Sequence, residues 1–188
     1  MARKKILKDK TQIIEAARRL IETDGIEAIS MIRLSKELGV SSMTLYNYVR
    51  NADEVLREIL ILTLSTFLER LYIYLCERKD LGESAIHSYA ISYSLALYDL
   101  AKESHDLCLY LISAGHAKFH QDAELRPFYE PFPLSLVQCA GADLQLKNEL
   151  NGMFRGVVFS LIYEHLIGSN RLTKDTYLNM VSWFVDRM

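Results

Sequence analysis

The sequence predicts an all-α fold, with a three-helix N-terminal domain followed by a longer helical domain. Apolar residues recur at helical spacing over most of the 188 residues. Only three prolines and eight glycines interrupt these stretches. β-branched residues do not alternate with polar residues over any long run, which argues against strands.

The first helix is expected over residues 10–24. Asp9 is a plausible N-cap, and Gln12 follows three residues later, as in a capping box. Gly25 provides the stop. The residues expected to be buried share one face: Ile13, Ala17, Leu20 and Ile21.

Residues 25–49 predict two short helices, 31–38 and 42–49, joined by a tight turn at 39–41. Ser30 and Ser41 are suitable N-caps, and Gly39 allows the sharp turn. Four apolar residues are expected to face inward: Leu34, Leu38, Leu45 and Val49. This is the layout of a helix-turn-helix, whose second helix enters the DNA major groove. The plainer alternative is a pair of packed helices without a DNA role.

The second of these helices carries candidate DNA contacts. Asn47 can pair with adenine, and Met43 can touch a thymine methyl group. Thr44 and Tyr48 offer hydroxyls suited to phosphate oxygens. Ser42 and Tyr46 occupy the other outward positions.

A long helix over about 52–78 is expected next, opened by a second capping box at Asn51 and Glu54. It links a domain of residues 1–50 to a domain of residues 51–188. The longest apolar run, 59–68, is too short and too soon charged to span a bilayer. We therefore expect no membrane association.

Further helices are expected over about 83–102, 105–118, 134–140, 143–167 and 174–187. Pro127, Pro131 and Pro133 exclude a continuous helix between residues 121 and 133. Gly168 is expected to end one helix, and Thr173 to cap the next.

The net charge of −2 is unevenly distributed. Residues 1–50 hold ten Lys or Arg and six Asp or Glu, whereas the remainder is acidic. Arg3, Lys4 and Lys5 begin a basic segment before the first helix, as expected of an arm that contacts phosphates. A solvated, disordered tail is the alternative. The N-terminus lacks the apolar region of a signal peptide, so a cytoplasmic location is expected.

Three segments resemble the TetR (tetracycline-repressor-like) family of transcriptional regulators: IIEAARRLIETDGIEAISM, LSKELGV and TLYNYVRNADEVL. They lie between Ile13 and Leu56. The resemblance implies a DNA-binding regulator in which Ser42, Met43 and Tyr46 approach bases and Thr44 and Tyr48 hold phosphates. Arg50 is retained, but Ala52 stands where relatives often have Lys. Ile32, with Arg33 beside it, stands where some relatives have Arg. The DNA-binding candidates are therefore Arg33, Ser42, Met43, Thr44, Tyr46, Asn47, Tyr48, Arg50, Arg3, Lys4 and Lys5.

The last two helices carry wide apolar arcs, which favour pairing with a second copy. Covering the domain's own core is the alternative. The resemblance also implies a homodimer on a palindromic operator, and an inducer cavity in the second domain. The candidate dimer residues are Val158, Ile162, His165, Tyr177, Val181 and Phe184. The candidate pocket residues are Tyr89, Tyr93, His116, Phe119, Phe128, Tyr129, Phe154 and Tyr163.

The sequence has no nucleophile motif, Gly-rich phosphate loop or HExxH motif, so an enzyme is not expected. No cofactor or metal is predicted, although a small-molecule effector is. Two other classes stay open. A metal or redox sensor would use His116, His120 or the cysteines, and a helical adaptor would bind protein rather than DNA. The favoured prediction is a sequence-specific DNA-binding regulator, acting as a ligand-responsive repressor.

Overall fold

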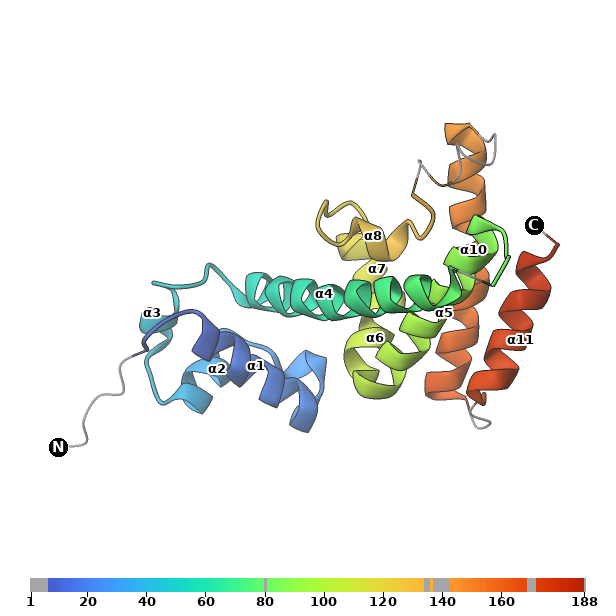
Figure 1. The fold of residues 1–188 in the computed structure, drawn as a ribbon. Coiled ribbons are helices and arrows are strands. Elements are labelled where there is room, and N and C mark those ends of the chain that lie inside the picture. The colour runs from blue at the N-terminus through green and yellow to red at the C-terminus, as the bar shows by residue number, and fades with distance from the viewer. Residues whose placement is uncertain (1–6, 80, 134–135, 137–142, 169–171, 188) are drawn as a thin grey trace. The chain divides into compact units, whose positions relative to one another are not determined.

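The computed structural model describes residues 7–79, 81–133, 136, 143–168 and 172–187 (Figure 1). Within these residues every regular element is helical, which confirms the all-α prediction. The chain divides into two compact units, Met1–Thr63 and Leu64–Met188. The division falls inside one continuous helix, α4 (Ala52–Arg78).

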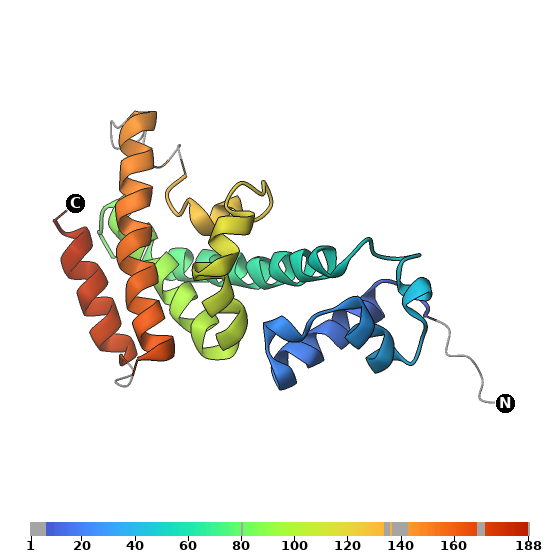
Figure 2. The same cartoon turned by 180° about the vertical axis from the view of Figure 1, so that it is seen from behind.

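Unit 1 contains α1 (Thr11–Asp24), a 3₁₀ turn η1 (Ile26–Ala28), α2 (Met31–Leu38), α3 (Ser42–Leu45) and the first turns of α4 (Figures 1 and 2). Asp9 Oδ1 accepts a hydrogen bond from Gln12 N (3.4 Å), while Lys8 N donates to Gln12 Oε1 (3.0 Å). The predicted inward positions are buried: Ile13, Ala17, Leu20, Ile21, Leu34, Leu38, Leu45 and Val49.

Ion pairs connect Lys10, the residue before α1, to the first turns of α4 within unit 1. Lys10 Nζ lies 2.9 Å from a carboxylate oxygen of Glu54 and 2.9 Å from one of Glu58. Burial acts to lower the pKa of Lys10, but hydrogen bonds and attraction from the two glutamates raise it above its ordinary value. Asn51 Oδ1 accepts from Glu54 N (2.8 Å), as the predicted capping box requires, and the Glu54 carboxylate accepts from the N–H of Arg50 (2.7 Å).

Unit 2 contains the rest of α4 and six further helices among the described residues. These are α5 (Ala85–Glu103), α6 (His105–Ile112), α7 (Ala114–Phe119), α8 (Arg126–Tyr129), α10 (Leu144–Ile167) and α11 (Lys174–Val185). Figure 2 shows α10 and α11 side by side, and α11 also packs on α5. Asp143 caps α10 and Thr173 caps α11, each accepting a backbone N–H three residues later.

The predicted helix over 105–118 is instead two helices. The break is at Ser113, whose backbone is non-helical and whose hydroxyl donates to Leu109 O (2.5 Å). Gly115 permits the close approach that follows, because a Cβ atom there would lie 2.8 Å from Tyr110 O. The short helix α8 was not expected, and Pro127 fits it because proline is tolerated in a first turn. Most of the helix expected over 134–140 lies outside the described residues.

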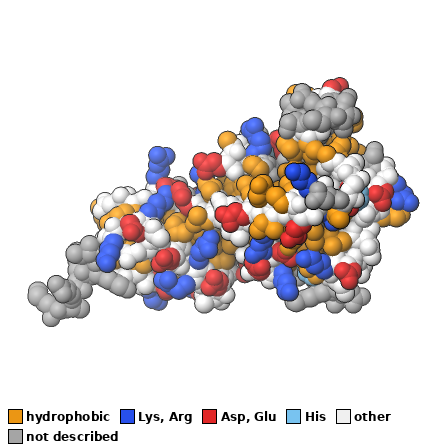
Figure 3. All heavy atoms as spheres, in the orientation of Figure 1, with side chains coloured by type: hydrophobic (Ala, Val, Ile, Leu, Met, Phe, Trp, Pro, Cys, Tyr) orange, Lys and Arg blue, Asp and Glu red, His pale blue; other side chains and the backbone are white. Residues whose placement is uncertain are grey.

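Helix α4 is, among the described residues, the one helix long and apolar enough to cross a membrane. Core helices of soluble proteins pass the same test, so this is weak evidence for a span. Seven of its apolar side chains are buried: Val55, Leu56, Ile59, Leu60, Leu64, Phe67 and Leu71. Others are exposed, including Leu68, Tyr72 and Ile73, and Figure 3 shows hydrophobic side chains at the surface along this helix.

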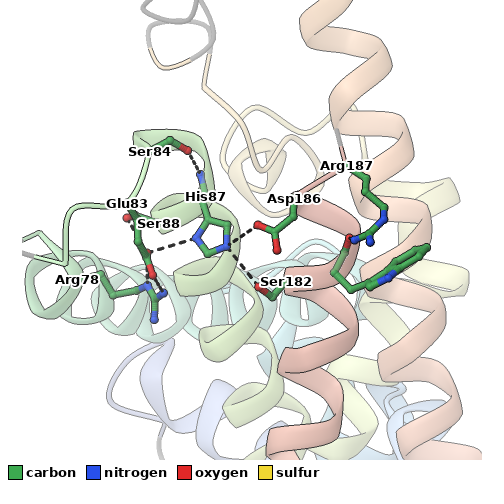
Figure 4. A network of polar contacts seen from close by, with 9 residues as sticks. Arg78, Glu83, Ser84, His87, Ser88, Ser182, Asp186 and Arg187 are labelled. Atoms are coloured by element: carbon green, nitrogen blue, oxygen red, sulfur yellow. Dashed lines mark hydrogen bonds and ion pairs between the residues drawn. The ribbon is translucent and has the colours of Figure 1, made fainter.

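A polar network in unit 2 joins the end of α4, the start of α5 and the end of α11 (Figure 4). Glu83 forms an ion pair with Arg78 and accepts from the Ser88 hydroxyl (3.0 Å). The His87 ring lies between Glu83 (3.3 Å) and Asp186 (3.4 Å). Burial acts to raise the pKa of Glu83, but hydrogen bonds from Ser88, His87 and Arg78 hold it below its ordinary value.

Candidate DNA-binding site

The turn between α2 and α3 forms as the sequence predicts. Ser30 Oγ accepts from Arg33 N (3.2 Å) at the start of α2. Gly39 has φ 68° and ψ 32°, the left-handed conformation that glycine adopts without steric cost. Ser41 Oγ then accepts from Thr44 N (3.2 Å) and caps α3. Gly39 and Ser41 together set the direction in which the chain leaves α2 and enters α3.

A chain of hydroxyls joins α3 to α2. The Ser42 hydroxyl donates to Ser35 Oγ (3.2 Å), and the Ser35 hydroxyl donates to Ile32 O (2.8 Å). Ser35 is buried, and its small side chain permits this approach. Ser42 was expected to approach bases, but its donor is used here to hold the two helices together.

The second helix of the motif is shorter than expected. Regular α-helix ends at Leu45 rather than at residue 49. Asn47 N donates to Thr44 O (3.4 Å) and Tyr48 N to Leu45 O (2.9 Å), each three residues back, so the backbone tightens at residues 47 and 48, whereas Val49 N donates to Leu45 O (3.0 Å), four residues back. Aromatic, Asn and β-branched residues are weak helix formers, which explains why residues 46–49 do not continue the helix.

Three side chains of this segment lie on the outside of unit 1. Met43 is 78% exposed and Tyr46 is 54% exposed, and Asn47 is also exposed. Two of the three were predicted to approach bases, and Asn47 to pair with adenine. Their exposure leaves them available to a base edge.

Other predicted DNA contacts are engaged within unit 1. The Tyr48 hydroxyl donates to Leu7 O (2.9 Å), and the Thr44 and Ser41 hydroxyls lie 2.9 Å apart. Arg33 forms an ion pair with Asp24, so it fastens α2 to the end of α1. The side chain of Arg50 is exposed. Arg3, Lys4 and Lys5 lie outside the described residues.

Comparisons with known proteins agree with this geometry. Residues 13–59 match the family model of bacterial regulatory proteins of the tetR family. A helix-turn-helix-type transcriptional regulator of Staphylococcus aureus is 30% identical over 132 residues, which cover 68% of each chain. The chain belongs to the TetR family of transcriptional regulators. It is therefore a DNA-binding transcriptional regulator.

Other relatives share less of the chain or only the fold. An uncharacterised helix-turn-helix-type regulator of Haemophilus influenzae is 37% identical over 60 residues, which cover 32% of each chain. The solved fatty acid degradation regulator FadR of Bacillus halodurans superposes with a TM-score of 0.65 at 15% identity, covering 97% of this chain and 96% of that one. A solved TetR/AcrR-family regulator of Thermobifida fusca superposes with a TM-score of 0.60 at 16% identity, covering 94% and 95%. The TetR-like fold thus extends over unit 2.

Most of the predicted pocket residues of this TetR-family chain meet in an aromatic cluster of unit 2. The Tyr93 ring lies edge-on to Phe67 (5.1 Å between centroids) and to Phe154 (5.8 Å). Phe128 contacts Phe67 (5.6 Å), and the Tyr93 hydroxyl donates to Phe128 O (2.5 Å). Five predicted residues are buried: Tyr93, Phe119, Phe128, Tyr129 and Phe154. The Tyr89 ring lies 6.2 Å from that of Phe132 and is half-buried, whereas Tyr163 is exposed on α10.

The predicted dimer residues of α10 and α11 are mostly in the core of unit 2. Val158, Ile162, Tyr177 and Val181 have no exposed surface within the single chain, because their helices pack on α5 and on each other. His165 and Phe184 are half-buried, and the His165 ring lies 4.8 Å from that of Tyr98. The alternative reading, that these arcs cover the domain's own core, holds for the buried four.

The histidines and cysteines weighed for a sensor form no metal-binding group of three or more within the described parts of the chain. His116 and His120 stack with centroids 5.3 Å apart, and His116 also meets Tyr129 edge-on at 5.1 Å. Burial, then repulsion by Arg155 and His120, lowers the pKa of His116. Cys76 is exposed and Cys108 buried, and both are free thiols, while Cys139 lies outside the described residues.

Two structural roles in unit 2 and unit 1 were not expected from the sequence. Asn151 brackets Phe132: its Oδ1 accepts from Phe132 N (2.7 Å) and its Nδ2 donates to Phe132 O (3.1 Å). Leu7 is buried and receives the Tyr48 hydroxyl on its carbonyl oxygen. In each pair the two residues lie far apart in the sequence and follow no periodic pattern, so only the folded structure reveals the contact.

Proposed function

We propose that this TetR-family protein is a ligand-responsive repressor that binds a palindromic operator as a homodimer in the cytoplasm, with no catalytic role. One observation carries the proposal: Met43, Tyr46 and Asn47 are exposed on the helix-turn-helix. The hydroxyls of Ser42, Thr44 and Tyr48, in contrast, make hydrogen bonds within unit 1. Exposed side chains of this kind at a recognition helix are suited to base edges.

The exposed faces of α10 and α11 support the homodimer. Met153, Tyr163 and Ile167 are exposed on α10, and Met180 and Trp183 on α11. Large apolar side chains in the open favour a protein interface. This exposed face therefore replaces the mostly buried residues predicted from the sequence as the candidate dimer interface.

Two glycines on α10 add to this support. A Cβ atom built on Gly152 or Gly156 would meet nothing within 4 Å, so the packing of this chain does not require glycine there. Glycine inside a helix costs about 1 kcal/mol relative to alanine. Close approach of a second helix is a reason to keep it.

Light scattering tests the homodimer. The wild-type chain is expected to show twice the 21.7 kDa chain mass, and Gly156→Glu to show a single chain mass. Tyr72→Glu, at an exposed position of α4, is the matched control and leaves the mass unchanged. A wild-type protein that stays monomeric at operator-binding concentrations overturns this part of the proposal.

The aromatic cluster around Tyr93 and Phe128 supports an apolar small-molecule effector. Binding sites for small molecules are mostly apolar with a few polar groups. The Ser92 hydroxyl is fully buried and has no hydrogen-bond partner among the described residues, so it is a candidate polar contact for such a ligand. A ligand that binds one conformation of unit 2 preferentially shifts the population, and α4 passes the change to unit 1.

The coupling gives a reciprocal test. If an apolar compound weakens operator binding by a given factor, operator DNA must weaken compound binding by the same factor. Fluorescence anisotropy with a labelled operator and thermal-shift titration of the compound measure the two sides. Compounds that stabilise the protein yet leave operator affinity unchanged contradict a regulatory role for their site.

Selection of bound duplexes from a random DNA pool tests sequence-specific binding. A palindromic sequence is expected to be enriched. Replacing Tyr46 and Asn47 together by alanine should then lower operator affinity at least roughly tenfold, since base contacts contribute about 1–3 kcal/mol each. Tyr72→Ala serves as the control. Unchanged operator affinity in the double variant refutes the assignment of this surface to DNA.

A further inference from the structure

Two apolar side chains of the helix-turn-helix are unusually exposed. Met43 is 78% exposed and Ile32 is 76% exposed, the highest values among the large hydrophobic side chains of the described residues. Both belong to unit 1, one on α3 and the other on α2. An apolar side chain held in water gains free energy when another apolar group covers it.

Hydrogen bonds of Ser42 and Ser35 connect the two segments that carry Met43 and Ile32. Ser42, the residue before Met43, donates to Ser35, and Ser35 donates to the carbonyl of Ile32. Ile32 is therefore held beside the beginning of the recognition segment. Its backbone position is fixed by the same contacts that position Met43.

Residues 37–49 lack the two charged residue types, Lys and Arg, that read guanine. No Lys or Arg occurs between Lys36 and Arg50. Arg33, next to Ile32, forms an ion pair with Asp24. Guanine is read mainly by Arg or Lys through its O6 and N7 acceptors, whereas the 5-methyl group of thymine is read by apolar contact. Asn47, exposed in the same segment, has the donor and acceptor pair that matches adenine.

We propose that this helix-turn-helix reads A·T base pairs, with Met43 and Ile32 against the 5-methyl groups of thymines and Asn47 on an adenine. The inference rests on the proposed sequence-specific operator binding and names what that site reads. It assigns Ile32 a role in specificity on α2, in addition to the side chains of α3.

The test replaces thymine by deoxyuridine, one position at a time, in the duplex enriched from a random pool. This change removes only the 5-methyl group. At one or two positions in each half-site, binding is expected to weaken about fourfold, the equivalent of one buried methyl-sized group. Elsewhere the substitution leaves the affinity unchanged.

Variants of the protein identify the reader of each methyl group. Met43→Ala should bind the thymine and uracil forms equally at one position, and Ile32→Ala should do so at another. Ile73→Ala, an exposed isoleucine of α4 in unit 2, is the matched control and keeps the full thymine preference. Because Met43 and Ile32 are exposed, their variants should keep the thermal stability of the wild type, which is measured alongside.

Adenine is tested separately with 7-deazaadenine, which lacks the N7 acceptor. Loss of that acceptor is expected to weaken wild-type binding roughly three- to tenfold at one position. The Asn47→Ala variant should not distinguish the two bases there.

The outcomes separate the two proposals. An enriched palindrome that tolerates uracil at every position, or a methyl preference that survives in both Met43→Ala and Ile32→Ala, overturns this inference and leaves the repressor proposal standing. A pool with no enriched sequence overturns the proposed function and this inference together.

Discussion

Removing the hydroxyl of Tyr48 is the most informative substitution, because the sequence and the structure predict different roles for that hydroxyl. The sequence pattern places Tyr48 at a DNA phosphate, whereas in the structure its hydroxyl donates to the carbonyl of Leu7 at 2.9 Å. Tyr48→Phe removes that hydroxyl and keeps the ring. If the structural role holds, the variant loses stability before any DNA is added.

The magnitude follows from the environment of the bond. A neutral hydrogen bond contributes about 1 kcal/mol, and the cost rises when the remaining partner is buried. Leu7 is 5% exposed, so its carbonyl has little access to water once Tyr48 no longer donates to it. We expect Tyr48→Phe to lower the free energy of unfolding by about 1 to 2 kcal/mol. This corresponds to a fall in Tm of roughly 2 to 8 °C for a chain of this size.

Thermal and urea denaturation at one fixed protein concentration measure the effect, because a dimer would make Tm depend on concentration. Tyr46→Phe is the matched control: the same chemical change two residues earlier, on a side chain that is 54% exposed. It should leave Tm unchanged. If both variants have the Tm of the wild type and Tyr48→Phe alone weakens DNA binding, the anchoring role is refuted and the phosphate role is supported.

Three further predictions concern the two units. Lys10→Met removes both ion pairs to Glu54 and Glu58 and should cost about 1 kcal/mol at low salt, with a smaller loss in 1 M NaCl, measured by urea denaturation against Lys8→Met; an equal loss at both salt concentrations contradicts the electrostatic explanation. Asn151→Ala leaves the buried N–H and C=O of Phe132 without their partner and should lower the free energy of unfolding by about 2 to 4 kcal/mol. Asn148→Ala, at an exposed position of the same helix, should be neutral. Equal Tm values for the two variants contradict a stabilising role for the two hydrogen bonds between Asn151 and Phe132. The folded pKa of Glu83 is held below its ordinary value of 4.5, so its contribution is present above that pH and is lost as the pH falls through the folded pKa. Glu83→Gln should therefore be less stable than the wild type near pH 7 and equal to it in strong acid, with Glu77→Gln as the control; a difference independent of pH excludes this linkage.

Local signals in the sequence were enough for much of unit 1. The caps at Ser30 and Ser41 and the left-handed Gly39 each involve residues no more than three apart, and each forms as expected. Inward positions such as Leu34 and Leu45 follow from helical spacing in the same way. Local chemistry determines these features, so the sequence alone predicts them.

Long-range pairing could not be predicted in this way. The sequence offers the hydroxyl of Tyr48 to any acceptor, and only the fold brings it to Leu7, 41 residues away. The same holds for Asn151, whose amide suits many partners. Spacing likewise shows that Val158 and Ile162 share a face of α10, but it does not tell whether that face meets the chain's own core or a second copy.

The early end of α3 limits how the side chains proposed to read bases can be exchanged with those of a regular recognition helix. The N–H groups of Asn47 and Tyr48 donate to carbonyl oxygens three residues back, whereas those of Tyr46 and Val49 donate to oxygens four residues back. At residues 47 and 48 successive side chains therefore rotate by about 120° rather than about 100°. Across these two residues the side-chain direction differs by about 40° from that of a regular helix. Side chains grafted at positions 47 or 48 from a regular recognition helix, aligned only by position, would therefore point in a different direction. Successful transplantation requires the backbone of the donor segment as well.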